Sequence, residues 1–156
     1  MKRFLYGNLL LLALPLCASC GSNAAPAPAK PAISSTYKTQ QTDNIHEALL
    51  SSYVRTPTLL YYVSLGAKDP SDAFIQRMRR RNIRIQKMSL SPQPYAKNRG
   101  GTNSPRNPML VVWPIRWLNP SRVELRVDST GAGSTYTLAQ KNGKWIVAAR
   151  KRKWIS

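Results

Sequence analysis

The chain of 156 residues has few of the side chains on which most catalytic and metal sites depend. It contains two cysteines, one histidine and six acidic residues, against 24 lysines and arginines. Both cysteines, Cys17 and Cys20, lie near the N-terminus. Residues 21–156 therefore offer no pair for a disulfide, no thiol nucleophile and no cysteine-rich zinc site. The sequence predicts neither a hydrolase nor a metalloenzyme, and no catalytic residue or cofactor is expected in the domain.

The acidic and histidine side chains also lack the spacing of a catalytic or metal site. His46 and Glu47 are adjacent, which places them on different faces of a helix, and no second histidine follows. Asp69 and Asp72 could act as paired carboxylates, but the intervening Pro70 is typical of a helix start. We expect Asp69 to be the N-cap and Pro70 to be the first helical residue. Asp72 would then lie near the positive end of the helix dipole.

The N-terminal segment has the order of a secretory signal peptide. Lys2 and Arg3 precede a leucine-rich run over residues 9–16. The whole apolar stretch, residues 4–16, is shorter than the roughly 20 residues that a membrane span requires. A signal peptide over residues 1–19 is the favoured interpretation.

The sequence Cys17-Ala18-Ser19-Cys20 resembles the lipobox of bacterial lipoproteins, in which two small residues precede the acceptor cysteine. Cys17 departs from the pattern, because leucine usually occupies that position. The resemblance implies a covalent diacylglycerol and a further acyl chain on Cys20, which together would anchor the protein to a membrane. It also implies the cell envelope. The outer membrane is favoured if the cell has one, because Gly21 replaces the aspartate that tends to retain lipoproteins at the inner membrane.

Composition divides the rest of the chain into a linker and a domain. Residues 20–36 are rich in alanine, proline and serine and contain no aromatic residue, which predicts a flexible linker after the lipidated Cys20. Residues 37–156 are long enough to form one domain with one core. This domain is strongly basic, since loss of residues 1–19 would lower the formal net charge of +18 by only two.

Hydrophobic periodicity predicts two short helices and five or six strands. The helices are expected over residues 43–54 and 70–81. The strands are expected over residues 58–65, 83–90 with a bulge at Lys87, 109–118 with Pro114 at an edge or bulge, 122–127, 134–140 and 145–149. Asn142-Gly143 is a strong hairpin signal between the last two strands.

These elements predict an α+β domain in which two helices pack on a curved antiparallel sheet. The order of helix first and antiparallel meander afterwards resembles cystatin-like and nuclear-transport-factor-like cone folds. That resemblance implies a cone-shaped sheet that could enclose a small apolar molecule. A ligand-pocket protein or an enzyme is therefore the alternative to a non-catalytic binding or structural module.

Two further features could bind ligands. The proline-rich loop over residues 91–108 contains Gly100-Gly101 with Arg99 and Arg106, which could cradle a phosphate but lack the order of a P-loop. Four tryptophans could form a platform for sugars or bases, although strand tryptophans of small domains usually belong to the core. They are Trp113, Trp117, Trp145 and Trp154.

Two basic clusters are the main candidate site, and no acid lies between Asp72 and Glu124 to provide a local counter-charge. The clusters are Arg77, Arg79, Arg80, Arg81, Arg84 and Lys87, and then Arg150, Lys151, Arg152 and Lys153. They could be a solvated face without a defined partner. They could also bind anionic envelope polymers such as lipid headgroups, lipopolysaccharide or cell-wall acids. Nucleic acid would bind such a face only non-specifically.

Overall fold

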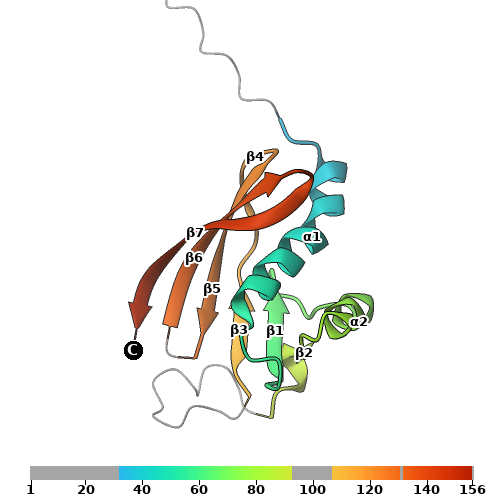
Figure 1. Ribbon diagram of the computed structural model, residues 1–156, viewed down its shortest axis with the longest axis vertical. Coiled ribbons are helices and arrows are strands. Elements are labelled where there is room, and N and C mark those ends of the chain that lie inside the picture. The colour runs from blue at the N-terminus through green and yellow to red at the C-terminus, as the bar shows by residue number, and fades with distance from the viewer. Residues whose placement is uncertain (1–31, 93–106, 131, 156) are drawn as a thin grey trace, which may run out of the picture. The chain divides into compact units, whose positions relative to one another are not determined.

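The computed structural model describes residues 32–92, 107–130 and 132–155, with backbone alone for residues 154–155 (Figure 1). In these ranges two α-helices accompany one mixed sheet of seven strands. The predicted α+β class is confirmed, whereas a wholly antiparallel sheet of five or six strands is wrong. No helix of the described residues has both the length and the hydropathy needed to cross a membrane.

The elements alternate between helix and strand in the first half of the domain and are all strands in the second. In chain order they are α1 Ser35–Tyr53, β1 Tyr61–Leu65, α2 Asp72–Arg80, β2 Ile85–Lys87, the 3-10 turn Met88–Leu90, β3 Met109–Val112, β4 Arg116–Asn119, β5 Arg122–Ser129, β6 Ala132–Lys141 and β7 Lys144–Ile155. The strand order is β2-β1-β3-β5-β6-β7, and β4 pairs with β5 off this path. β1 runs parallel to β2 and to β3, and the other pairs are antiparallel.

Helix α1 begins at Ser35, earlier than its apolar periodicity predicts. Its first half is polar, and contacts with the distant strands stabilise it. The ring of Tyr37 meets that of Trp117 edge to face, with the centroids 5.8 Å apart. The Nε1 atom of Trp145 donates to Oε1 of Gln41 over 2.8 Å. Such long-range contacts leave no periodic signal in the sequence.

Helix α2 begins at Asp72, two residues later than expected, because its N-cap is Ser71 and not Asp69. Ser71 is extended, and its Oγ accepts the Phe74 N–H over 3.2 Å. The predicted capping role of Asp69 is wrong. Its Oδ1 instead accepts the N–H of Ser89 over 3.2 Å, which joins the start of α2 to the 3-10 turn.

The strand boundaries differ from the pattern where proline or a turn interrupts it. The expected strand over residues 109–118 is divided into β3 and β4, with Pro114 in the gap. The expected bulge at Lys87 is the end of β2, and the 3-10 turn follows it. The hairpin between β6 and β7 is confirmed, with φ of 51° at Asn142 and 74° at Gly143.

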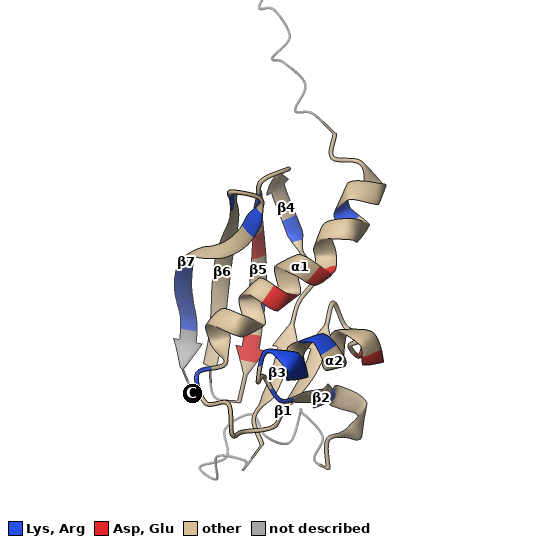
Figure 2. Cartoon of the chain, turned by 45° about the vertical axis from the view of Figure 1, so that its right-hand side comes forward, with Lys and Arg blue, Asp and Glu red and all other residues tan. Residues whose placement is uncertain are grey.

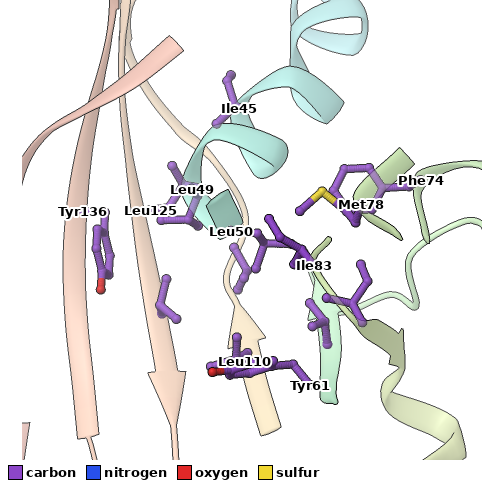
Figure 3. Packing of buried hydrophobic residues seen from close by; sticks show 14 of the residues in the cluster. Ile45, Leu49, Leu50, Tyr61, Phe74, Met78, Ile83, Leu110, Leu125 and Tyr136 are labelled. Atoms are coloured by element: carbon purple, nitrogen blue, oxygen red, sulfur yellow. The ribbon is translucent and has the colours of Figure 1, made fainter. Parts of the chain in front are cut away.

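The core lies between the sheet and the two helices (Figure 3). Ile45, Leu49 and Leu50 of α1 meet Phe74 and Met78 of α2 over the inward side chains of the strands. The sheet contributes Tyr61, Val63, Ile85, Leu110, Val112, Val123, Leu125, Val127, Tyr136, Leu138 and Trp145. The inward face of the sheet is therefore covered by α1 and α2.

Candidate functional site

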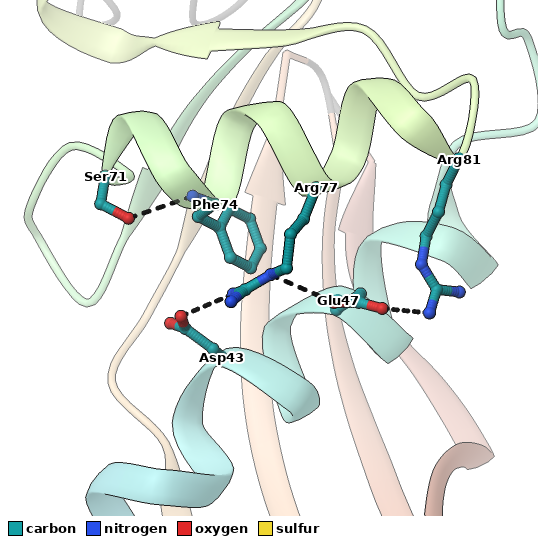
Figure 4. Close-up of polar contacts among 6 residues, drawn as sticks. All are labelled: Asp43, Glu47, Ser71, Phe74, Arg77 and Arg81. Carbon is teal, nitrogen blue, oxygen red and sulfur yellow. Dashed lines mark hydrogen bonds and ion pairs between the residues drawn. The ribbon is translucent and has the colours of Figure 1, made fainter.

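Two arginines of the first basic cluster bind acids of α1 (Figure 4). The Nη2 atom of Arg77 lies 2.6 Å from Oδ2 of Asp43, and its Nε lies 3.6 Å from Glu47. Arg81 forms an ion pair with the same Glu47, whose side chain is only 15% exposed. The sequence did not reveal these ion pairs, because their partners on α1 and α2 are far apart in the chain. The expectation that the cluster has no local counter-charge is wrong for both arginines.

The remaining acids are also engaged within the domain. Lys87 pairs with Asp72 over 2.9 Å, so that a third member of the cluster has a counter-charge. Ion pairs also join Arg116 to Glu124 and Arg126 to Asp128. Together with Asp69, which accepts from Ser89, these contacts occupy all six acidic residues of the chain. The other basic side chains have no carboxylate partner among the described residues.

Three cations of the first cluster are therefore free to meet an external anion. Arg79 and Arg80 are exposed on the last turn of α2 and have no ion pair within the described ranges. Arg84 is also exposed, and its Nη1 donates to the carbonyl of Thr58 over 3.1 Å. That bond places Arg84 beside the segment that connects α1 to β1.

The second cluster lies on β7 and is divided between the two faces of the sheet. Arg150 lies opposite Tyr136, whereas Lys151 lies opposite Thr135. Because strand side chains alternate, Arg150 points to the helix side and Lys151 to the other side. The four residues 150–153 are all exposed, but they do not form one continuous face.

The structure adds Arg55, which sequence reasoning missed, between the two clusters. Arg55 and Arg150 line the same surface hollow, and Arg84 contacts the connection that follows Arg55. Figure 2 shows basic positions at the end of α2 and along the final part of β7. We call the set formed by Arg55, Arg79, Arg80, Arg84, Arg150 and Arg152 the basic arc. An isolated arginine after a helix carries no sequence signal that would mark it.

The hollow at one end of the arc has a volume of about 430 Å³. It is lined by Ser52, Tyr53, Arg55, Thr56, Tyr61, Tyr136, Val147 and Arg150, and no acidic residue contributes to it. The Nε and Nη2 atoms of Arg150 donate to Oγ of the buried Ser134 over 3.3 and 3.2 Å. Its guanidinium carbon lies 5.3 Å from the ring centroid of Tyr136. Arg150 is thus oriented before any ligand binds.

Three tyrosines meet at this hollow, and none of them stood out in the sequence. The ring centroids of Tyr53 and Tyr136 are 6.2 Å apart. In Figure 3 the Tyr61 side chain extends from β1 with its hydroxyl on the side of the view where Tyr136 of β6 lies. Burial raises the pKa of the Tyr61 and Tyr136 phenols above the ordinary value of 10.0. Both hydroxyls therefore keep their protons at neutral pH and can donate.

The tryptophans do not form one exposed platform. Trp145 is buried and stacks edge to face with the half-buried Trp117, with centroids 5.9 Å apart. Trp113 is 41% exposed, and its Nε1 donates over 2.9 Å to the buried Asp128, which also accepts two hydrogen bonds from Arg126. Asp128 is thus saturated by its own neighbours. The side chain of Trp154 lies outside the described residues.

The remaining candidates do not assemble a metal site in the part of the chain that the structure describes. Burial lowers the pKa of His46 to about 4, and its Nε2 has no hydrogen-bond partner there. No group of three histidine, cysteine, aspartate or glutamate side chains among those residues could hold a metal ion. Gly100-Gly101 with Arg99 and Arg106 lies outside the described residues, as does Cys20.

Comparison with known proteins adds no relative. No protein-family model, curated protein or solved structure matches the chain.

Proposed function

We propose that this protein is a lipid-anchored envelope module that is not an enzyme and that binds anionic envelope polymers through its basic arc. The mature chain begins at Cys20, and lipid on that cysteine holds it at a membrane, the outer membrane in a cell with two. The expected linker, residues 20–36, is shortened at its end by α1, which begins at Ser35, so residues 20–34 act as the linker between the lipid and the domain. The partners are lipopolysaccharide, acidic lipid headgroups or cell-wall acids.

The arrangement of charge carries this proposal. All six acidic side chains are engaged by a neighbour, so the arginines of the arc have no carboxylate partner among the described residues to compete with an external anion. Arg79 and Arg80 on α2, and Arg150 on β7, come from elements far apart in the sequence. An excess of one charge over such a surface attracts polymers of the opposite sign and concentrates them near it.

The core supports surface binding over an enclosed pocket. The helix side of the sheet is filled by Ile45, Leu49 and Leu50 of α1 and by Phe74 and Met78 of α2, all at most 1% exposed. A ligand would have to displace these side chains in order to enter the core, and large apolar groups cost about 2–5 kcal/mol each to remove. A ligand is better placed on the surface that the arc covers.

The anchor is tested by mass spectrometry of the mature N-terminus. We expect a chain that starts at Cys20 and carries a diacylglyceryl thioether and an amide-linked acyl group. A chain with Cys20→Ala should remain unprocessed and without lipid. An unmodified mature chain that begins at another residue would contradict the anchor.

The binding surface is tested by retention of the detergent-solubilised chain on immobilised lipopolysaccharide and on heparin across a salt series. Retention should weaken steeply with salt, because exposed charges are screened over about 8 Å at physiological ionic strength. The double variant Arg79→Gln and Arg80→Gln should elute at clearly lower salt. Arg122→Gln with Lys141→Gln is the matched control, because these exposed cations lie at the opposite end of the β5–β6 pair. Equal elution of the two double variants would refute the role of the arc.

A further inference from the structure

The hollow beside Arg55 and Arg150 differs from the rest of the basic arc because two arginines and several hydroxyl-bearing side chains line the same concave surface. Arg79 and Arg80 extend into solvent from the end of α2, whereas Arg55 and Arg150 line one concave site from different elements. The hydroxyl-bearing side chains of Ser52 and Thr56 line it as well. A flat charged surface recognises charge density, while a concave site with oriented donors can recognise one chemical group.

The donors available in the hollow fit a phosphate group. Nε and Nη2 of Arg150 donate to Ser134, so the second terminal nitrogen of the same guanidinium stays available to a ligand. Arg55 adds a second positive charge from the segment after α1. Two guanidinium groups match the charge of about −1.5 to −2 that a phosphate monoester carries at neutral pH. Ser134 holds Arg150 in place, which lowers the entropy lost when the ligand binds.

The rest of the hollow is aromatic. The rings of Tyr53 and Tyr136 stand 6.2 Å apart, and Tyr61 adds a third phenol. No hydrogen bond involves the hydroxyls of these three tyrosines among the described residues, so all three remain available as donors and acceptors. A volume of about 430 Å³ is larger than a phosphate alone requires and leaves room for an attached ring. Phenol groups that combine an apolar face with a polar tip suit a ring that carries many hydroxyls.

We propose that this hollow binds a phosphorylated sugar unit, with the phosphate between Arg55 and Arg150 and the sugar against the tyrosines. The hollow lies at one end of the basic arc. That phosphorylated sugars reach it as parts of envelope polymers rests on the proposed function. The phosphate provides the charge attraction, and the sugar provides the contacts that inorganic phosphate lacks. The chain should therefore bind a sugar phosphate more tightly than either component.

The test is a titration of the full chain, solubilised in neutral detergent, with four soluble probes at constant ionic strength. The probes are glucose 1-phosphate, glucose 6-phosphate, glucose and inorganic phosphate, and binding is measured by calorimetry and by amide chemical shifts. We expect at least one sugar phosphate to bind several-fold more tightly than inorganic phosphate, with shifts at Tyr53 and Tyr136. Arg55→Gln should weaken that binding about tenfold or more, since it removes a charge-assisted contact. Tyr136→Phe should weaken it about three- to tenfold.

The matched control is Lys151→Gln, because Lys151 neighbours Arg150 on β7 but points to the opposite face. This substitution removes the same charge and should leave the affinity within about twofold, the effect expected of a distant exposed charge. Arg55 is exposed, so its substitution should preserve the fold, which circular dichroism checks. Equal losses in Arg55→Gln and Lys151→Gln, or no binding of either sugar phosphate by the folded chain, would overturn the inference. Polymer retention that depends on Arg79 and Arg80 could still be observed in that case, so the two proposals can fail separately.

Discussion

His46 shows how one residue couples this fold to pH. The side chain is 5% exposed on α1, and burial lowers its pKa from the ordinary value of 6.5 to about 4. The nearby Asp43 opposes the shift but does not reverse it. In the unfolded chain His46 takes up a proton near pH 6.5, whereas in the folded chain it does so only near pH 4. The stabilisation by neutral His46 is therefore complete above pH 6.5 and is lost as the pH falls from 6.5 to about 4.

The expected loss reaches about 3 kcal/mol at the acidic end of the window, since each unit of pKa difference corresponds to about 1.4 kcal/mol. Urea unfolding of the wild-type chain and of His46→Leu at pH 7 and pH 4.5 measures it. As the pH is lowered from 7 to 4.5, we expect the free energy of unfolding to decrease more steeply in the wild type than in the variant. The comparison of slopes removes the contribution of the carboxylates, which both chains share. Equal slopes would show that His46 is not buried in its neutral form.

Sequence reasoning at the residue scale found His46 but not its environment. A lone histidine beside Glu47 gave no metal or catalytic pattern, and nothing in the spacing showed whether its side chain is solvated or packed. The residues that line the hollow, Tyr53, Tyr61 and Arg55, could not be grouped in advance, because they come together only after α1 packs on the sheet. Local spacing identifies caps and turns, whereas a surface site depends on the path of the whole chain.

At the scale of the elements, α2 is short and owes its start to one hydroxyl. Ser71 accepts the Phe74 N–H, and Asp72 follows in the first turn near the positive end of the dipole. Ser71→Ala should lower the free energy of unfolding by about 1 kcal/mol, because it leaves a helix-terminal N–H without its cap. Ser71→Asp should preserve most of the stability. Chemical denaturation measures the free energy of unfolding of both variants. Asp69→Ala is the control, because it leaves this cap intact and should not show the decrease that loss of the cap causes. Equal stability of the wild type and Ser71→Ala would contradict the assignment.

Strand β7 poses a different problem, because it is long and lies at the edge of the sheet. It spans Lys144–Ile155, 12 residues, and in the described sheet it pairs only with β6. Exposed edges of this length present free backbone groups to other chains, and charged side chains are a common protection. The basic run over residues 150–153 therefore has a structural use beside its proposed part in binding.

Replacement of all four basic residues of this run by threonine should promote self-association, because the change removes the charges and raises the β-propensity of the edge. Sedimentation velocity at low and physiological salt measures it. Lys141→Thr with Lys144→Thr serves as the control, because these residues flank the hairpin turn at the other end of β7. A quadruple variant that stays monomeric at all concentrations would contradict edge protection.

The elements were predicted best where the signal is local. Asn142-Gly143 gave the hairpin correctly because both residues adopt the positive φ that this turn requires. The pairing of β1 with β2 and β3 is parallel, and it was missed because parallel partners are joined by distant connections that leave no alternation pattern. Pro114 was expected at an edge or bulge, and it lies in the gap between β3 and β4.

At the scale of the whole molecule, charge is the dominant feature. The formal net charge is +18, and the basic side chains greatly outnumber the acids that could neutralise them. Net charge could be read directly from composition. Its distribution could not, because the ion pairs of Arg77 and Arg81 with α1 require the packed helices. The fold thus pairs two arginines of the predicted cluster with acids of α1 and adds Arg55 to the cations that remain without a carboxylate partner.

Such an imbalance predicts an unusual response of thermal stability to salt. Repulsion among the arc and the other cations destabilises the compact state, and salt screens that repulsion. Salt also weakens the internal ion pairs, but exposed pairs contribute only about 0–1 kcal/mol each. Because every acid is already engaged, the net interaction among the remaining exposed charges is repulsive. Screening should therefore stabilise the domain.

We expect the melting temperature to rise by several degrees as sodium chloride increases from low to physiological concentration. A decrease of about 1 kcal/mol in the repulsion between the cations corresponds to an increase of roughly 3–6 °C in the melting temperature of a domain of this size. Sodium phosphate at the same ionic strength should raise it further, because anions bound at the arc stabilise the folded state by mass action. Arg55→Gln should reduce this additional effect of phosphate more than Lys151→Gln does, since only Arg55 lines the hollow. A melting temperature that falls with sodium chloride would mean that the internal ion pairs, and not the repulsion between exposed cations, dominate the electrostatic free energy.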